Sequence, residues 1–352
     1  MAMSFDPAAM AGAQPPGGNM MNPQAMMQMM QMMQMMQMMQ GGAAPSMMGD
    51  PSAQPFVHQV PEAAADPLLE ADLLRPGKLT SLVKEQQALP LQSVLDVLCL
   101  TPDGKNALGG VPKGCTIAFA GPPGKGKTRS ALEGLLRAAH SGLPCLYVVA
   151  EEGFLDESGS GRDPLGSRMA KIGMAMFGMT EAELIEQVLG KITVLQAQYH
   201  KGHSWDDFVT RYRYVVDREK TQFVVVDSLN MLDPTKARTA DNLNSLKTYN
   251  HEKGITCLTI GQIRDTGMPV GGEALMHTAD VVFLIEEMSI GSKEMGAFWG
   301  AAYRDVLSVI KAVKSVTTPI FPHPIRLAQD SATGTLRIHA QQPADYLPYP
   351  VR

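Results

Sequence analysis

The residues from Gly121 to Thr128 read Gly-Pro-Pro-Gly-Lys-Gly-Lys-Thr and match the pattern GxxxxGK[ST] at every fixed position. They follow an apolar run and precede a helical pattern, which is the setting that a phosphate-binding turn needs. Backbone N–H groups in such a turn close on phosphates, the lysine reaches the terminal phosphates, and the threonine hydroxyl binds Mg²⁺. We therefore expect a site for the phosphates of a nucleotide and for Mg²⁺ rather than a chance glycine-rich turn. Its candidate contact residues are Gly121, Pro122, Pro123, Gly124, Lys125, Gly126, Lys127, Thr128 and Arg129.

Acidic residues end two further apolar runs. The run Phe-Val-Val-Val ends in Asp227, and the run Tyr-Val-Val-Ala ends in Glu151 and Glu152. Because the carboxyl ends of parallel strands meet at one edge of a sheet, these acids should lie beside the phosphate turn. We expect Asp227 and Thr128 to hold Mg²⁺, which needs only one or two protein oxygens. An acid of the second run can polarise a water for attack on the terminal phosphate, although acid pairs at strand ends are also common as solvated edges.

The pattern of the rest of the chain predicts the elements that position these residues. From residue 108 onward, short β-branched runs alternate with helical stretches, which is typical of an α/β fold with a mostly parallel sheet flanked by helices. Thr180-Glu-Ala-Glu183 is a capping box, and residues 330–334 form the turn between the last two strands. The expected strands are 115–120, 145–150, 191–196, 222–227, 255–261, 280–285, 306–313, 325–328 and 335–339. The expected helices are 127–140, 165–177, 180–189, 204–219 and 239–252.

The N-terminal segment differs in composition from the remainder. Seventeen of the 26 methionines lie in the first 48 residues, and residues 26–40 repeat the unit Met-Met-Gln. A period of three drifts around a helix of 3.6 residues per turn, so it leaves no fixed face. We interpret the segment as a disordered tail, with a surface for a protein partner or a soft-metal thioether site as alternatives. The expected domains are a tail (1–65), a short helical segment (66–104), an α/β domain (105–342) and a C-terminal tail (343–352).

Charge and cysteine usage exclude several classes of protein. Residues 1–74 hold six of the 35 acidic residues and none of the 30 basic ones, so the rest of the chain is close to neutral. Charge therefore neither requires nor excludes a nucleic-acid partner. The four cysteines are scattered singly, which argues against a zinc module or a disulfide framework. Without a basic signal-peptide start or a run of about 18 apolar residues, we expect a cytoplasmic protein with no membrane partner.

Several further motifs accompany the turn at Gly121–Thr128 and the two acid-ended runs. They are Leu108-Gly-Gly-Val-Pro-Lys-Gly114, Val225-Val-Asp-Ser228, Ile260-Gly-Gln-Ile-Arg264, Gly271-Gly-Glu-Ala-Leu275, His277 and Ala279-Asp-Val-Val282. In this order along the chain, the motifs resemble those of the RecA-like ATPases, and the nearest branch looks like bacterial RadA (Sms) and KaiC. The resemblance covers about residues 105–340, and it implies a RecA-like P-loop core that binds ATP and Mg²⁺.

The resemblance implies roles for four residues at the phosphate site. Glu151 corresponds to the catalytic base and Glu152 to its companion. Lys127 corresponds to the lysine that contacts the β- and γ-phosphates. Gln262 corresponds to the residue that senses the γ-phosphate and passes its state to the loop that follows.

The resemblance also implies a candidate DNA surface. The loop at about 263–272 corresponds to a DNA-contacting loop of recombinases, and Arg264 is its only basic residue. Lys236 and Arg238 occupy the corresponding earlier loop. Both loops are also ordinary surface connections, so contact with single-stranded DNA and plain solvation both remain open.

The chain departs from RadA in ways that bear on its activity. It has neither the four-cysteine zinc module nor the protease-like C-terminal domain of that family. Lys314 matches the lysine of a RadA motif, but Ser-Val-Thr-Thr follows it where RadA has Asn-Arg-Phe-Gly, so Val316 takes the arginine position. In related hexamers such a Lys and Arg reach the neighbour's γ-phosphate. Lys314 is the candidate here, with Arg304 as a substitute arginine, and the resemblance implies a homo-oligomeric ring, hexameric in the family, or a filament.

The leading hypothesis is a Mg²⁺-dependent ATPase that couples ATP hydrolysis to binding of single-stranded DNA in recombination or repair. One alternative is a KaiC-like regulatory ATPase with a protein partner, recruited through the Met/Gln tail. Another is an assembly ATPase that uses nucleotide mainly to polymerise. Stimulation of hydrolysis by single-stranded DNA would separate the first hypothesis from the other two.

Overall fold

The computed structural model describes residues 76–78, 80, 84–155, 159, 161, 163–198, 204–232, 238–263, 267, 269–270 and 272–351. The chain divides into two compact units, residues 1–79 and 80–352. Of the first unit, a single 3-10 turn at Pro76–Lys78 is described. The expectations for residues 1–65 therefore lie outside the described residues.

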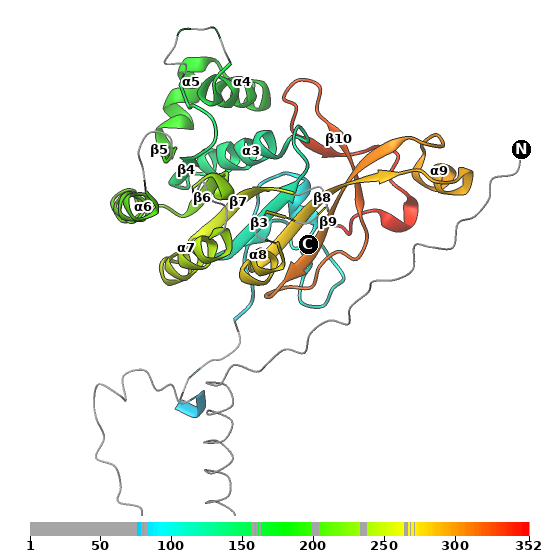
Figure 1. The fold of residues 1–352 in the computed structure, drawn as a ribbon, viewed down its shortest axis with the longest axis horizontal. Helices are drawn as coiled ribbons and strands as arrows, with labels where there is room; N and C mark the ends of the chain where they lie inside the picture. Colours follow the sequence, from blue (N-terminus) through cyan, green and yellow to red (C-terminus); the bar gives the residue numbers. More distant parts are fainter. Residues whose placement is uncertain are drawn as a thin grey trace, which may run out of the picture. The chain divides into compact units, whose positions relative to one another are not determined.

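The second unit is built on a nine-stranded sheet with the order β11-β10-β9-β8-β3-β7-β6-β4-β5 (Figure 1). The six strands from β8 to β5 are parallel, and β9, β10 and β11 extend the sheet as antiparallel strands. This arrangement confirms the predicted α/β fold with a mostly parallel sheet. The strands are β3 Thr116–Gly121, β4 Cys145–Val149, β5 Ile192–Gln196, β6 Phe223–Asp227, β7 Thr256–Gln262, β8 Val281–Ser289, β9 Val306–Ser315, β10 Ile325–Gln329 and β11 Leu336–Ile338.

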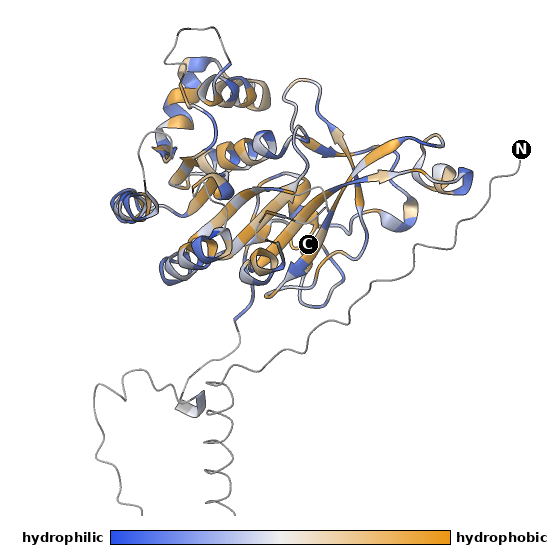
Figure 2. Cartoon of the chain, viewed as in Figure 1, coloured by the Kyte–Doolittle hydropathy of each residue, from blue (hydrophilic) through white to orange (hydrophobic). Residues whose placement is uncertain are grey.

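Helices cover both faces of this sheet. Ile117 and Phe119 pack into a core shared with α3 and α4, whereas Ala118 between them packs into a second core shared with α6, α7 and α8. The central strands β3, β4 and β6 are buried along their whole length, as expected of parallel strands covered on both faces, and Figure 2 shows them as a continuous apolar layer. The helices are α3 Lys127–His140, α4 Leu165–Phe177, α5 Glu181–Gln187, α6 Trp205–Glu219, α7 Thr239–Lys253, α8 Gly272–Thr278 and α9 Lys293–Trp299.

The segment before the core differs from the predicted short helices. Between residues 84 and 104 the structure has a two-residue strand, β1 Ala88–Leu89, paired with β2 Val111–Pro112, and a 3-10 turn at Val94–Val97. Leu91, Val94, Leu95 and Leu98, whose helical spacing predicted a helix here, are all buried, so the spacing indicated burial correctly. No α-helix forms there because Gln92 has a φ of 49° and the Asp96 carboxylate accepts the backbone N–H groups of Leu91 and Gln92.

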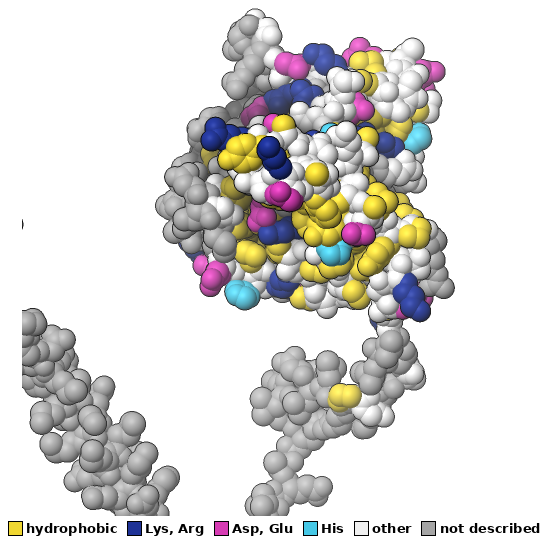
Figure 3. Space-filling model, turned by 90° about the vertical axis from the view of Figure 1, so that its right-hand side faces the viewer, with side chains coloured by type: hydrophobic (Ala, Val, Ile, Leu, Met, Phe, Trp, Pro, Cys, Tyr) yellow, Lys and Arg dark blue, Asp and Glu magenta, His cyan; other side chains and the backbone are white. Residues whose placement is uncertain are grey.

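The C-terminal part of the chain carries exposed apolar side chains. Figure 3 shows hydrophobic side chains gathered on the face that lies at the right of Figure 1, where α9 is found. Among the described residues, no helix is long and apolar enough to cross a membrane. Most of the exposed large hydrophobic side chains in the described part of the chain come from its C-terminal part: Phe298, Tyr303, Val306, Val316, Ile338, Leu347 and Val351.

Candidate nucleotide-binding and catalytic site

The turn between β3 and α3 carries the predicted phosphate site. Gly124 and Gly126 adopt φ values of +71° and +82°, a left-handed region that strains other residues, so the glycines of the motif meet a backbone requirement. Gly126 precedes the first turn of α3 and supplies no side-chain cap. The first N–H groups of α3 therefore have no side-chain acceptor, and the end of the helix is suited to bind an anion.

Lys127 lies inside this turn. Its Nζ donates to the carbonyls of Gly121, at 2.9 Å, and Pro122, at 2.6 Å, and the residue is only 7% exposed. Burial lowers the pKa of Lys127, and the nearby carboxylates of Asp227 and Glu151 oppose that shift. The turn's own carbonyls thus hold the ammonium group beside the helix end, as the predicted phosphate contact requires.

Asp227 ends β6 and lies beside the first residues of α3. Hydroxyl groups of Thr128 and Tyr147 hydrogen-bond its carboxylate, the latter at 3.1 Å. Burial raises the pKa of Asp227 to about 6, and these two hydrogen bonds oppose the shift. A hydroxyl and a carboxylate side by side are hard oxygen ligands, and a cation would offset the cost of burying the carboxylate charge. The residues present therefore fit Mg²⁺.

Glu151 follows β4 and meets residues from two other strands. Ser228 Oγ donates to its Oε2 at 2.9 Å, and Gln262 Nε2 donates to its Oε1 at 3.2 Å. Glu151 and Gln262 are distant in sequence, and the structure brings them together. Ser228, which the sequence indicated only as part of the Asp227 motif, completes the arrangement.

Glu152 is turned toward a different partner. It forms an ion pair with Arg168, which lies in the first turn of α4. Gln198 Nε2 donates to the backbone carbonyl of Glu152 at 2.6 Å. Sequence reasoning missed Arg168, because no local pattern marks it and its partner Glu152 lies in a separate segment after β4.

Two neighbouring cavities share Gly124, Lys127, Thr128 and Glu152. A nucleotide's phosphate chain that followed the α3 end would touch both. The first, about 270 Å³, is lined by Pro123, Gly124, Lys127, Thr128, Glu151, Glu152, Asp227, Ser228, Ile260 and Gln262. The second, about 280 Å³, is lined by Gly124, Lys125, Gly126, Lys127, Thr128, Arg129, Glu152, Arg168, Gln329 and Gly334.

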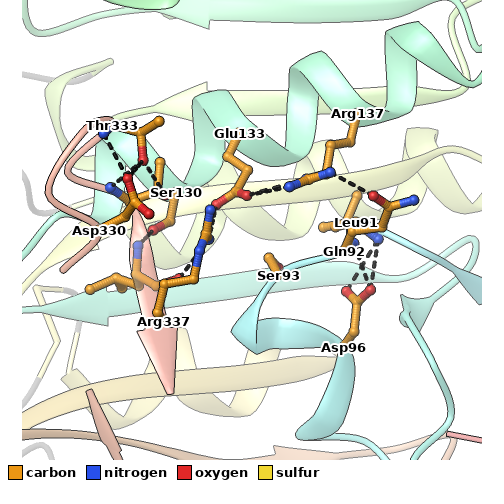
Figure 4. Close-up of polar contacts among 12 residues, drawn as sticks. Leu91, Gln92, Ser93, Asp96, Ser130, Glu133, Arg137, Asp330, Thr333 and Arg337 are labelled. Atoms are coloured by element: carbon orange, nitrogen blue, oxygen red, sulfur yellow. Dashed lines mark hydrogen bonds and ion pairs between the residues drawn. The ribbon is translucent and has the colours of Figure 1, made fainter. Parts of the chain in front are cut away.

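The β10–β11 hairpin forms a wall of the second cavity through Gln329 and Gly334. Glu133, fully buried in α3, pairs with Arg337 of this hairpin and also with Arg137 of α3, the latter at 3.0 Å (Figure 4). The hairpin is therefore hydrogen-bonded to α3, the helix whose N-terminus forms the candidate phosphate site. Its hydrogen bonds to α3 are Arg129 Nη1 to the Thr333 carbonyl (2.9 Å), Leu336 N–H to Ser130 Oγ (2.9 Å) and Arg337 Nη1 to Glu133 Oε2 (2.7 Å).

Lys314 lies away from the phosphate turn. Its Nζ donates to three carbonyls at the end of α8, those of Met276, His277 and Ala279, at 3.1, 2.5 and 2.7 Å. Within one chain it therefore stabilises the C-terminus of α8, and it lines neither cavity. Arg304 also lines neither of the two cavities.

The candidate DNA contacts are described only in part. Arg238 is exposed and immediately precedes α7. Lys236 and Arg264 lie outside the described residues. The DNA surface therefore stays a prediction.

Comparison with known proteins agrees with this architecture. A family model described as "ATPase: KaiC" matches residues 93–319, a range that contains the phosphate turn, Glu151, Asp227 and Gln262. The chain belongs to this KaiC-type ATPase family. The DNA repair and recombination protein RadB of Methanosphaera stadtmanae is 38% identical over 76 residues, 22% of this chain and 29% of that protein. The chain thus spans under a third of that relative's length. Together, the two matches confirm the predicted resemblance to RecA-like ATPases near RadA and KaiC.

Membership of the KaiC-type family assigns nucleotide binding and ATPase chemistry to this part of the chain in general terms. The family match ends at residue 319, so the β10–β11 hairpin lies beyond it. That hairpin nevertheless lies beside the candidate phosphate site, because Gln329 and Gly334 line the second cavity together with residues of the phosphate turn.

Proposed function

We propose that this KaiC-type ATPase hydrolyses ATP with Mg²⁺ and couples hydrolysis to binding of single-stranded DNA. The observation that carries the proposal is the hydrogen bond between Gln262 and Glu151. It joins the acid after β4 to the last residue of β7, and the candidate DNA loop follows directly on β7. The partial similarity to a RadB protein supports a place in repair or recombination.

The residues of the site have separable tasks in this proposal. The α3 end and Lys127 bind phosphate oxygens, and Thr128 and Asp227 supply oxygens for Mg²⁺. Bound Mg²⁺ would neutralise charge on the terminal phosphates during transfer. Glu151 accepts the proton of the attacking water at one carboxylate oxygen, while Ser228 and Gln262 orient the carboxyl group.

Coupling to DNA follows from the position of Gln262. Its amide is within hydrogen-bond reach of the proposed base, and Arg264 follows two residues later. A change of hydrogen-bond partner at Gln262 would therefore alter the start of the 263–272 loop. The same chain of residues would let bound DNA change the orientation of Glu151.

A second function is favoured by the family match. The model that matches is that of KaiC, so a regulatory ATPase that acts on a protein partner is the alternative. In that case the residues of the site keep the same tasks, and the output of hydrolysis is a change in protein contacts.

One experiment separates the two functions. ATP hydrolysis by the full chain is measured with and without single-stranded DNA, and DNA binding is measured from about 50 to 200 mM salt. The DNA-coupled function requires stimulation, and it requires binding that weakens steeply as salt rises, because phosphate contacts release counterions. Hydrolysis that is unchanged by DNA at every salt concentration would contradict it and favour the regulatory function. Arg264→Ala should reduce DNA binding, and Arg264→Lys is the matched control that keeps the charge.

A further inference from the structure

Glu151 and Glu152 are adjacent in sequence but have different partners. Glu151 accepts hydrogen bonds from Ser228 and Gln262, both uncharged. Glu152 instead pairs with the guanidinium of Arg168. The two acids therefore differ in the charge of their hydrogen-bond partners.

Arg168 reaches this position from α4 and is largely covered. Its side chain is 18% exposed, and its Nε is buried without a hydrogen-bond partner among the described residues. Among the residues that the structure describes, Glu152 is thus the partner that holds the guanidinium by an ion pair. Arg168 and Glu152 both line the second cavity, together with residues of the phosphate turn.

The ion pair matters because the lining of the first cavity has more acidic than basic side chains. Three carboxylates line that cavity, those of Glu151, Glu152 and Asp227, whereas Lys127 is its basic lining residue in the described part of the chain. A nucleotide brings several further negative charges into the same space. An unpaired Glu152 would repel that phosphate chain, and low polarity at a partly buried site strengthens such repulsion.

We propose that Arg168 is a positioning residue that neutralises Glu152 and holds its carboxylate away from the phosphate path. Glu151 is then the one acid of the pair that is free to act on water. This inference rests on the proposed ATPase function, and it assigns different tasks to the two glutamates. It also predicts that Arg168 matters only while residue 152 carries a negative charge.

A double-mutant cycle tests that requirement. Binding of Mg²⁺ and the non-hydrolysable analogue AMP-PNP to the full chain is measured by calorimetry for Arg168→Ala, in the wild-type and Glu152→Gln backgrounds. We expect Arg168→Ala to raise Kd about tenfold in the wild-type background and less than about twofold in the Glu152→Gln background. An equal loss in both backgrounds would mean that Arg168 contacts the nucleotide directly or only stabilises the fold. That result, or no loss in either background, overturns the proposal.

Further variants separate electrostatics from damage to α4. Lys171→Ala removes a cation from the same helix, at an exposed ion pair with Asp163, and should change Kd less than about twofold. Arg168→Lys keeps the charge and should recover part of the loss caused by Arg168→Ala. Steady-state rates for the same variants should show the loss mainly in KM. If the wild-type chain binds the analogue but does not hydrolyse ATP, the proposed function fails while the binding cycle is still decisive for Arg168.

Discussion

Glu151 is the acid whose surroundings suit proton transfer, because both of its hydrogen-bond donors are uncharged side chains, whereas Glu152 forms an ion pair with Arg168. We predict that Glu151→Gln lowers kcat by about 10²–10⁴-fold, since glutamine has the same shape but cannot accept the proton. ATP binding should change little, because the phosphate contacts come from α3. Rates and AMP-PNP affinity measured together check this. Glu181→Gln, an exposed acid on α5, is the control, and unreduced turnover in Glu151→Gln would refute the assignment.

Asp96 offers a second residue-scale prediction, concerning stability and pH. Burial raises the pKa of Asp96 to about 6, against hydrogen bonds from Gln92 and Leu91 and the charge of Arg137. The folded state therefore binds more protons than the unfolded state between about pH 4 and 6, so this group's contribution to stability falls as pH rises through that window. Asp96→Asn keeps an oxygen acceptor and removes the titration. Relative to the variant, the wild type should lose roughly 2–3 kcal/mol of unfolding free energy between about pH 4 and 7.

Urea unfolding of the wild type and Asp96→Asn at several pH values measures this difference directly. The comparison cancels the other titrating groups that both proteins share. Parallel stability curves for the two proteins would show that Asp96 has no raised pKa in the folded state.

At the scale of elements, the β10–β11 hairpin depends on a buried charge in α3. Removing Arg337 leaves the fully buried Glu133 with Arg137 as its remaining partner. Arg337→Ala should therefore destabilise the fold by about 1–3 kcal/mol, less than the loss of a sole partner because one ion pair remains. Arg218→Ala, which removes an exposed pair with Glu219, should leave the urea midpoint nearly unchanged. Equal effects of the two substitutions on urea midpoints would argue against this anchor.

The helices and strands also show which parts of the fold could be predicted from the sequence alone. The pattern of apolar residues predicted α3 and α4 with the observed bounds and five of the six parallel strands within about one residue, because such patterns are local. The strand predicted at 280–285 is longer than expected, since β8 extends to Ser289. The short helix α9 was missed, although Ser292 caps it and Gly300 ends it, because seven residues give too little periodicity. The contact of Arg168 with Glu152 and the contacts of the hairpin with α3 could not be predicted from local patterns. The residues in each contact come from different elements, up to about 200 residues apart, and meet only after the sheet is assembled.

At the scale of the whole molecule, the first cavity of one chain is short of positive charge, whereas Lys125, Arg129 and Arg168 line the second cavity. Lys127 is the basic residue that lines the first cavity in the described part of the chain, and Lys314 is bound to the end of α8. Transfer of a phosphoryl group spreads negative charge over the terminal oxygens, and an arginine or lysine beside them accelerates it strongly. We therefore expect a second copy of the chain to complete the site, in agreement with the homo-oligomer implied by the family resemblance.

This expectation predicts that ATPase activity per protomer rises with protein concentration. If a neighbour supplies a cation, isolated protomers bind ATP but hydrolyse it slowly, and assembly raises kcat rather than affinity. Sedimentation velocity and hydrolysis rates measured over the same concentration range, with Mg²⁺ and ATP present, should change together. The matched test adds Glu151→Gln protomers to the wild-type chain at constant wild-type concentration. These protomers lack the proposed base but can still donate a cation to a wild-type site. They should therefore raise the wild-type rate at dilutions where the wild-type chain alone does not assemble. A rate per protomer that stays constant while the sedimentation coefficient changes would mean that each chain contains a complete site.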